Sequence, residues 1–420
     1  MPEQTPRLGT NPEPASVMGP VRPRERIETI DILRGFALFG ILLVNWTIDW
    51  QWDPEPQAGS SVVDQVTYWL IKFAAVGKFW PIFSFLFGLG FAIQIERLEA
   101  RGAQVARLYS RRLLVLFVIG AANFILVGPS DVVYRYAILG FLLLLMRKWP
   151  ARALPLVAVV FVLLPWAHTT WQGWERERRL ANPATAAEAV REVEQRRAEN
   201  LARWAQWEHT YETGSFEEIV TLRAGIWKRR LFSWDRYDYF FPLLLLGFYV
   251  GRRRLFHNVS GNRRFIHRVM WWSLAIGLIG TTASMLLLTG RDAPFLARQL
   301  SSLLDRFSSP ALAFFYIAGL TLLLEKPLWK RRTQPLAAAG RMTLTNYLLH
   351  HVVYLLFFGY GFELSGNVGV FRGAMLTLPV FFMQVLLSTW WLQSFRFGPA
   401  EWLWRTLTYG KLQPMRVKQA

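Results

Sequence analysis

Cysteine is absent from the 420 residues of this chain. Its absence excludes both a disulfide framework and a thiolate metal site. It also means that any covalent intermediate formed here would use a group other than a thiol. Charged residues are scarce as well, at 18% of the chain, against about 25% in ordinary soluble domains. A soluble globular enzyme is therefore a poor match for this composition.

Acidic residues are the scarcer charge type. The chain holds 29 Asp and Glu against 48 Lys and Arg, a net charge of +19, yet its mean hydropathy is +0.21. Long uncharged apolar runs are atypical of nucleic-acid-binding proteins, so we expect no nucleic-acid partner. The 20 Trp and 31 Phe instead favour a membrane protein, in which aromatic rings fill helix packing and interfacial belts. Membrane lipid is the partner that this composition predicts.

Apolar runs recur along the chain at roughly the length that crosses a bilayer, about 20 residues. The shorter ones are expected to extend into their flanks. The sequence therefore predicts an all-α fold: a polytopic integral membrane helical bundle of about ten transmembrane helices. The ten segments are 32–50, 79–95, 113–128, 132–146, 152–168, 237–250, 269–289, 309–324, 342–361 and 373–395.

The connections between these segments alternate between rich and poor in Lys and Arg. Basic short loops stay on the cytoplasmic side of a membrane, so the alternation predicts that both termini are cytoplasmic. The rich set holds 28 Lys and Arg, in residues 1–31, 96–112, 147–152, 251–268, 325–341 and 396–420. The poor set holds 5, in residues 49–65, 128–136, 290–308 and 361–372.

The membrane domain is expected to cover residues 27–410, with a tail on each side and one insert within it. Residues 1–26 contain six Pro and no apolar run, which predicts a disordered tail. Residues 411–420 form a basic cytoplasmic tail. Residues 169–236 carry 12 Lys and Arg, but long loops largely escape the charge rule, so we expect an extracytoplasmic helical insert.

Helix-start patterns support structure within this insert. Thr185 with Glu188, and Ser215 with Glu218, have the spacing of capping boxes. Apolar residues after Thr185 fall near one helical face, which either lies on the bilayer or covers an outer cavity. The alternative is a solvated, partly ordered loop.

Polar residues inside a span need a partner or a function. Asp31 opens the first span, where it can cap the helix and pair with Arg34. Arg34 either anchors the helix at the inner interface or binds an anion in a cytoplasmic cavity. Asn45 lies on a nearby face about 16 Å further along the helix, from the 1.5 Å rise per residue. It either hydrogen-bonds a neighbouring helix or belongs to the same site.

Lys78 lies just before the second span. Its side chain either extends to the interface, as long cationic side chains do, or is a buried site residue that faces Asp49 or Asp53.

A polar stripe marks the ninth span. Thr343, Asn346, Tyr347 and His350 share one helical face by their spacing, and His351 follows directly. A structural hydrogen-bond network is one interpretation. The other is a general base, because imidazole titrates near neutral pH. No further metal-ligand residues cluster with the histidines, so no metal site is predicted.

Three stretches resemble one known family. They are residues 26–45, which include Leu33-Arg34-Gly35, the Phe83-Ser84-Phe85-Leu86-Phe87-Gly88 segment, and residues 340–410. Together they resemble the YeiB family of uncharacterised bacterial inner-membrane proteins. The resemblance covers nearly the whole chain outside the Pro-rich tail and the insert. It implies a multi-pass protein of the bacterial inner (cytoplasmic) membrane.

The first helix more distantly resembles that of the transmembrane acyltransferase superfamily. Its members include heparan-glucosaminide acetyltransferases and polysaccharide O-acyltransferases, which pass an acyl group from cytoplasmic acyl-CoA to an acceptor. Arg34 matches, and Asn45 stands where the O-acyltransferases have a functional His. The glucosaminide branch resembles this chain in having Asn at that place, and it has its catalytic His in the first outer loop. Residues 46–77, which include that loop here, contain no His. His350, three residues after Tyr347, resembles a His in a late helix of the glucosaminide branch.

This second resemblance implies roles for particular residues. Acyl-CoA would be a donor substrate rather than a permanently bound cofactor, and a small molecule or glycan would be the acceptor. The alternative is a small-molecule transporter or receptor without enzymatic activity, with the polar stripe as its substrate path. The catalytic residues would be His350, helped by Asn346 and Tyr347, together with Asn45. The donor would bind to Arg34, Arg252, Arg341 and Arg396. Lys78 and Asp49 would lie on the acceptor side.

Overall fold

The computed structural model describes residues 27–49, 60–100, 102, 104–128, 131–233, 237–288, 293–358 and 368–417. Within these ranges the fold is all-α, and an isolated bridge between Phe395 and Arg416 is the extent of its β-pairing. The helices are α1 (Glu28–Val44), α2 (Val62–Ala74), α3 (Phe79–Ala100), α4 (Val105–Leu126), α5 (Val133–Leu145), α6 (Ala153–Ala181), α7 (Ala186–Thr213), α8 (Phe216–Leu231), α9 (Tyr237–Arg252), α10 (Arg263–Leu287), α11 (Phe295–Leu323), α12 (Pro327–Arg341), α13 (Thr343–Phe358), α14 (Val370–Ser394) and α15 (Pro399–Tyr409). Short π- or 3₁₀-turns are η2 (Asn45–Asp49), η3 (Met146–Lys148) and η5 (Leu255–His257).

Each of the ten predicted apolar segments contains a helix. Seven helical segments in the described ranges are long and apolar enough to cross a membrane, and one of them joins α2 to α3. The helices α5, α9 and α13 are shorter, at 13, 16 and 16 residues. Most residues of α9 are buried by neighbouring helices, so this helix is apolar because it packs inside protein. The protein is thus a multi-pass helical membrane protein.

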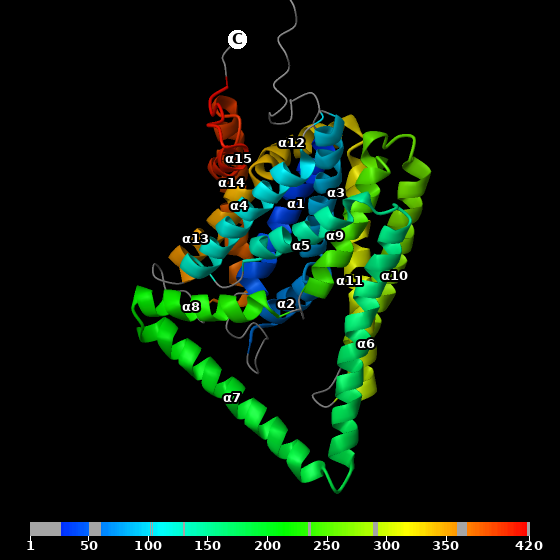
Figure 1. Cartoon of the computed structure of the whole chain (residues 1–420), viewed down its shortest axis with the longest axis vertical. Helices are drawn as coiled ribbons and strands as arrows, with labels where there is room; N and C mark the ends of the chain where they lie inside the picture. Colours follow the sequence, from blue (N-terminus) through cyan, green and yellow to red (C-terminus); the bar gives the residue numbers. More distant parts are fainter. Residues whose placement is uncertain are drawn as a thin grey trace, which may run out of the picture.

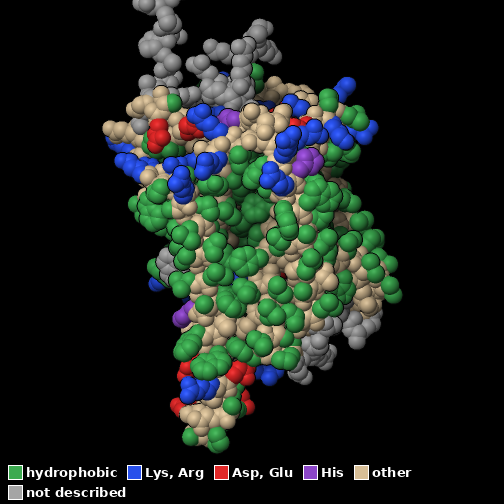
Figure 2. All heavy atoms as spheres, turned by 90° about the vertical axis from the view of Figure 1, so that its right-hand side faces the viewer, with side chains coloured by type: hydrophobic (Ala, Val, Ile, Leu, Met, Phe, Trp, Pro, Cys, Tyr) green, Lys and Arg blue, Asp and Glu red, His purple; other side chains and the backbone are tan. Residues whose placement is uncertain are grey.

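The two ends of the bundle differ in charge and content. The start of α1 lies at the same end as α12 and α15, whereas α2, α7 and α8 lie at the other end (Figure 1). Figure 2 shows a band of Lys and Arg at the first end, above a broad belt of apolar side chains. We call the first end the basic end and the second the insert end. Exposed arginines of the basic end include Arg252, Arg253, Arg254, Arg263 and Arg264.

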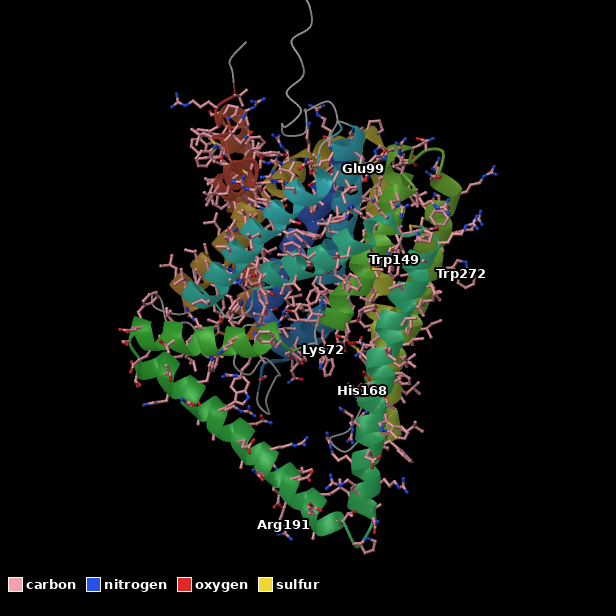
Figure 3. The ribbon with its side chains drawn as sticks, in the orientation of Figure 1. Lys72, Glu99, Trp149, His168, Arg191 and Trp272 are labelled. Carbon is pink, nitrogen blue, oxygen red and sulfur yellow. The ribbon has the colours of Figure 1, made fainter. Side chains whose placement is uncertain are left out.

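The segment predicted as an insert is helical throughout most of its length. Helix α6 continues past the predicted end of its span to Ala181, and α7 then crosses back diagonally towards α8 (Figure 1). Figure 3 shows Arg191 near the far tip of this insert, and Trp149 close to the basic end. The insert therefore projects well beyond the bundle.

One of the two predicted capping boxes is confirmed. Ser215 and Glu218 exchange both capping hydrogen bonds, and acceptance of the Ser215 N–H lowers the pKa of the Glu218 carboxyl. The other prediction is wrong: Thr185 makes no cap, because its hydroxyl donates to the Arg179 carbonyl oxygen instead. Arg179 also forms a two-armed ion pair with Glu192 at 2.9 and 3.2 Å, which closes the α6–α7 corner.

Helices α1 and α12 cross with their backbones in contact. A Cβ on Gly340 would overlap the carbonyl oxygen of Asp31, and one on Gly35 would overlap that of Leu336. Small residues permit such an approach in membrane bundles. The crossing fixes Arg34 and Arg341 near each other at the basic end.

Replacing Gly340 with Val is expected to destabilise the bundle by about 1–3 kcal/mol or more, as overpacking does. Thermal unfolding of the detergent-solubilised protein measures the loss. The matched control is Gly319→Ala in α11, where the nearest atom to an added Cβ is the Met270 sulfur at 3.9 Å. Equal midpoints for Gly340→Val and the native protein would contradict the close crossing.

Candidate functional site

A cavity of about 530 Å³ lies inside the bundle, lined by residues of α1, α3, α4, α5, α8, α9, α12, α13 and α15. Arg34 of α1 and Asn45, the first residue of η2, both line it. These residues are eleven positions apart, so the cavity follows the helix for about 16 Å. The cavity therefore extends from the basic end well into the bundle.

Four arginines line the cavity at its basic end: Arg34, Arg112, Arg341 and Arg405. The Arg34 guanidinium forms an ion pair with Asp31 at 3.0 Å. The Arg112 guanidinium lies over the Trp404 ring, 3.8 Å from its centroid. Guanidinium groups present forked donors that match phosphate and carboxylate. This end of the cavity is therefore suited to an anion with several charged oxygens.

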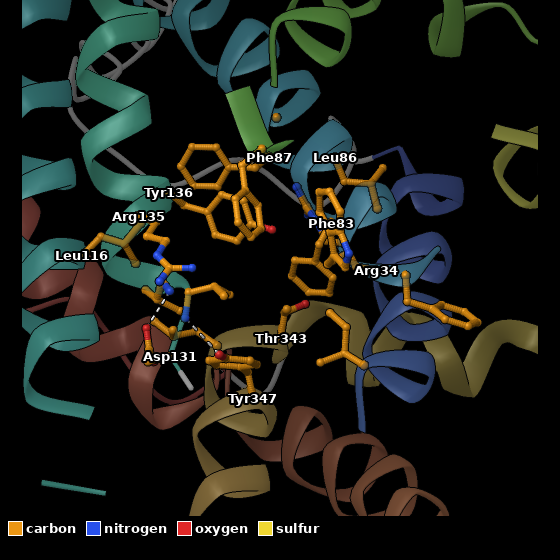
Figure 4. Close-up of a pocket in the computed structure, with 18 of the residues that line it drawn as sticks. Arg34, Phe83, Leu86, Phe87, Leu116, Asp131, Arg135, Tyr136, Thr343 and Tyr347 are labelled. Carbon is orange, nitrogen blue, oxygen red and sulfur yellow. Dashed lines mark hydrogen bonds between the residues drawn. The ribbon is translucent and has the colours of Figure 1, made fainter. Parts of the chain in front are cut away.

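Aromatic rings line the cavity beyond these arginines. Phe83 and Phe87 come from α3 and Tyr136 from α5, and Figure 4 shows them between Arg34 and Arg135. The Phe87 and Tyr136 rings stack with centroids 5.4 Å apart. The Tyr136 hydroxyl is held by Ser84, 3.0 Å away. This part of the cavity suits an apolar or planar group.

A second group of charges lines the cavity towards the insert end. Asp131 and Arg135 lie at the start of α5, and Arg230 lies at the end of α8. The Asp131 carboxylate accepts hydrogen bonds from Asn123 Nδ2 and from the Val133 N–H, both at 2.6 Å. Neither Asp131 nor Arg135 is more than a few per cent exposed. Sequence reasoning missed both, although their i, i+4 spacing at a helix start is a recognisable pattern.

Helix α13 contributes Thr343 and Tyr347 to the cavity wall. The Tyr347 hydroxyl oxygen accepts a hydrogen bond from the Val132 N–H at 3.3 Å, as drawn in Figure 4. With that lone pair used, the hydroxyl hydrogen remains available for an acceptor in the cavity. Tyr347 is thus the member of the predicted catalytic set best placed to contact a ligand.

The starts of α13 and α15 cap each other. The Glu401 carboxylate accepts from the Leu344 N–H at 2.6 Å, the Thr345 N–H at 3.2 Å and the Thr345 hydroxyl at 2.6 Å. In return, Thr345 Oγ1 accepts from the Ala400 N–H at 3.1 Å. A carboxylate at a helix N-terminus satisfies unpaired N–H groups and complements the helix dipole. Glu401 was not predicted as a functional residue, and no local pattern marks it.

The other half of the predicted polar stripe faces α14 rather than the cavity. Asn346 Nδ2 donates to Ser388 Oγ at 2.9 Å, and His350 Nε2 lies 2.9 Å from Gln384 Oε1. His350 is fully buried, and its Nδ1 has no hydrogen-bond partner among the described residues. His351 Nδ1 lies 3.2 Å from the Tyr347 carbonyl oxygen. The catalytic role predicted for His350 and Asn346 therefore stays a prediction, for residues that do not line the cavity.

The predicted acceptor-side residues are not brought together. Lys78 is 2% exposed and interacts electrostatically with Asp305 of α11, a residue that the sequence did not suggest. Asp49 ends η2, and its side chain lies outside the described part of the chain, as does all of Asp53. The pairing expected of Lys78 with these aspartates stays a prediction.

The predicted donor-binding arginines divide into two pairs. Arg34 and Arg341 line the cavity. Arg252 is exposed and donates to the Trp149 carbonyl oxygen, while Arg396 is exposed beside the Phe395–Arg416 bridge. Arg112 and Arg405 line the cavity, where Arg252 and Arg396 were expected.

Comparison with known proteins places the chain among relatives that share nearly its full length. It is 30% identical to the uncharacterized protein YxaH of Bacillus subtilis, over 96% of this chain and 99% of YxaH. It is 29% identical, with the same coverage, to an uncharacterized 39.9 kDa protein in the amylase 3' region of Bacillus acidopullulyticus. YeiB of Escherichia coli is 25% identical over 91% of this chain and 96% of YeiB. A family model described as a protein of unknown function (DUF418) matches residues 250–411, the part that contains α13 and α15.

Replacing Glu401 with Gln is expected to destabilise the protein by about 1–2 kcal/mol, because the cap loses its charge. Thr345→Val removes the opposite cap. Since both caps join the same two helix ends, the double variant is expected to lose less than the sum of the single losses. Thermal unfolding in detergent tests this, with the exposed Glu199→Gln of α7 as the control. Strictly additive losses would argue against a shared junction.

Proposed function

Because this chain belongs to the YeiB-like family of uncharacterised proteins that includes YxaH, we propose a function from its cavity: this membrane protein binds acyl-CoA at the basic end and transfers the acyl group to an acceptor that occupies the rest of the cavity. The acyl donor is a substrate, bound only during turnover. The acceptor is a small molecule or a glycan.

The proposed topology has ten membrane-crossing helices in the bacterial inner membrane, with α5, α9 and α13 among them. Both termini and the basic end face the cytoplasm, and the insert of α7 and α8 lies outside. The support is the distribution of Lys and Arg, which gather at the basic end (Figure 2) as cytoplasmic loops do. The cavity's arginine-lined end then faces the compartment that contains acyl-CoA.

The observation that supports the proposal is the order of charged and aromatic surfaces along one cavity. Arginine side chains surround its basic end, and Phe83, Phe87 and Tyr136 follow directly. Acyl-CoA has the same order of parts: phosphates at one end and an uncharged pantetheine and acyl thioester at the other. Forked guanidinium donors suit the phosphates, and the aromatic section suits the thioester arm.

Two cavity residues are placed to act on the thioester. Tyr347 has a hydroxyl hydrogen free to donate, and Asn45 of η2 contributes an amide to the cavity wall. Both can donate to the oxygen that gains negative charge as the acceptor attacks the carbonyl carbon. The new bond joins the acceptor's oxygen or nitrogen to that carbon, the carbon–sulfur bond breaks, and the CoA sulfur takes up the proton that the acceptor loses. The distant acyltransferase resemblance at Arg34 agrees with this arrangement, whereas Asn45 departs from the O-acyltransferase pattern, which has a His at that place.

His350 has an indirect part in this proposal. Its bond to Gln384 fixes α13 against α14, and Tyr347 lies one turn earlier on the same helix. The ring centroids of Tyr347 and His350 are 6.5 Å apart. His350 is therefore proposed as a positioning residue for Tyr347.

A transporter is the second candidate, favoured by the reach of the cavity. The same space is lined at the basic end by Arg341 and further along by Asn45, Gly77 and Trp80. A transporter of organic anions would use both regions in turn. It would bind acyl-CoA no more tightly than other anions of equal charge.

Acyl-CoA is expected to stabilise the purified native protein, by about 2.7 kcal/mol at a concentration of one hundred times Kd. Arg34→Gln and Arg341→Gln are each expected to weaken this binding about tenfold or more, since each removes a charge-assisted hydrogen bond worth about 1.5–3 kcal/mol. Thermal unfolding across a titration of acetyl-CoA measures both effects. Arg252→Gln and Arg396→Gln are matched controls that lie off the cavity. No stabilisation at millimolar acetyl-CoA, or equal effects of all four variants, would refute the donor site.

Tyr347→Phe is expected to lower kcat for acyl transfer by about 10²–10³-fold, the cost of losing one oxyanion donor, with the KM for acyl-CoA nearly unchanged. Transfer of a radiolabelled acetyl group from acetyl-CoA into membrane extracts provides the measurement. His350→Gln is measured in parallel. Full loss of activity in His350→Gln with normal activity in Tyr347→Phe would give the catalytic role to the histidine.

A further inference from the structure

Arg135 is a buried cation in the cavity wall whose donors are only partly used. Arg135 is 4% exposed, and its Nε donates to the Tyr134 hydroxyl at 3.0 Å. Among the described residues, its two terminal nitrogens have no hydrogen-bond partner within reach. Figure 4 shows the guanidinium at the side of the cavity, across from Arg34.

The nearby carboxylate of Asp131 does not neutralise Arg135 by direct contact. Asp131 takes its hydrogen bonds from Asn123 and the Val133 N–H, and it acts on Arg135 only through space. Unused terminal donors on a buried guanidinium are costly in an apolar bundle, and an ionisable residue inside a membrane protein marks a substrate site by default. The terminal nitrogens of Arg135 are therefore positioned for an anionic group in the cavity.

A second arginine lines the cavity in this region. Arg230 of α8 lines the same cavity, with its guanidinium 5.7 Å from the centroid of the Phe124 ring. Arg135, Arg230 and the Asp131 carboxylate therefore all line this region of the cavity. The Asp131 oxygens add hydrogen-bond acceptors beside it.

We propose that Arg135 and Arg230 form a second anion site, which holds a small hydroxylated organic anion as the acceptor in the proposed acyl transfer. The anionic group, a carboxylate or a phosphate monoester, binds the two arginines, and a neighbouring hydroxyl donates to Asp131. The aromatic rings of Phe83, Phe87 and Tyr136 separate this site from the arginines of the basic end (Figure 4). Donor and acceptor then bind at the same time. The inference rests on the proposed function for the role of the anion as acceptor, but the anion site itself does not.

Three probes with the same three-carbon skeleton test the site: glycerate carries a carboxylate, glycerol 3-phosphate carries a phosphate, and glycerol carries neither. Thermal unfolding of the full-length protein in detergent is followed while each probe is titrated, with and without saturating CoA. At least one of the two anions is expected to stabilise the protein, with glycerol inert at the same concentration. Saturating CoA is expected to leave that stabilisation in place, and the preferred anion identifies the chemical class.

Arg135→Gln is expected to raise the anion concentration for half-maximal stabilisation by about tenfold or more, the cost of a charge-assisted hydrogen bond, while the response to acetyl-CoA stays normal. Arg34→Gln is expected to show the reverse. Arg135→Lys, which keeps the charge but loses the fork, gives an intermediate shift and serves if Arg135→Gln does not fold; Arg230→Gln repeats the test from the insert side.

The outcomes separate this site from the donor site. Anion binding that depends on Arg135, in a protein that ignores acetyl-CoA, supports the anion site and refutes the acyltransferase. Acetyl-CoA binding without any response to glycerate or glycerol 3-phosphate overturns the anion site. Equal half-maximal concentrations in the native protein and Arg135→Gln also overturn it, and so does loss of anion binding when CoA is added.

Discussion

The cavity depends on the contact between the Glu401 carboxylate and the first turn of α13. This carboxylate holds the Leu344 and Thr345 N–H groups, and Thr345 holds the start of α15 in return. Because a helix is rigid over a few turns, fixing its first turn also fixes where Tyr347 lies along the cavity wall. Helix α15 then carries Trp404 to α4, where the indole N–H donates to the Arg112 carbonyl oxygen at 2.9 Å. One buried carboxylate thereby connects three helices around the arginine-lined end.

Buried cations in this bundle fall into two kinds, and the difference identifies the site. Arg306 of α11 is 2.8 Å from Asp238 of α9, with both side chains less than a tenth exposed. In this pair the two opposite charges are in direct contact, which holds α9 and α11 together. Arg135 instead keeps its terminal donors beside an open cavity. A buried cation that makes no direct ion pair is better explained by ligand binding than by stability.

The sequence predicted the positions of the helices well, because these depend on local properties. It predicted poorly which side chains meet in space. Each of the ten apolar segments contains a helix, because hydropathy is a property of a short window. The polar stripe of α13 was also predicted as one face. However, a stripe about a quarter of a turn wide can touch two surroundings: Thr343 and Tyr347 line the cavity, whereas Asn346 and His350 bond to α14. Periodicity gives the face of a helix but not the neighbour on each edge of that face.

The arginines show the same limit. Arg34 and Arg341 were predicted from their places at helix ends, and they line the cavity together with Arg112 and Arg405. Arg252 and Arg396 have similar places along their helices and lie outside. Which cations meet depends on helix crossings such as that of α1 with α12, which are decided by backbone contacts between residues far apart in the chain.

That crossing has a consequence for how the protein is made. Gly35 lies against α12, and Gly340 lies against α1, so the first helix receives its main packing partner only after about 300 further residues have left the ribosome. At about 5–20 residues per second, this takes roughly 15–60 s. Throughout that interval α1 lacks the partner that packs against Gly35. Biogenesis of this protein therefore includes a waiting period for its N-terminal helix, which ends when the C-terminal third is inserted.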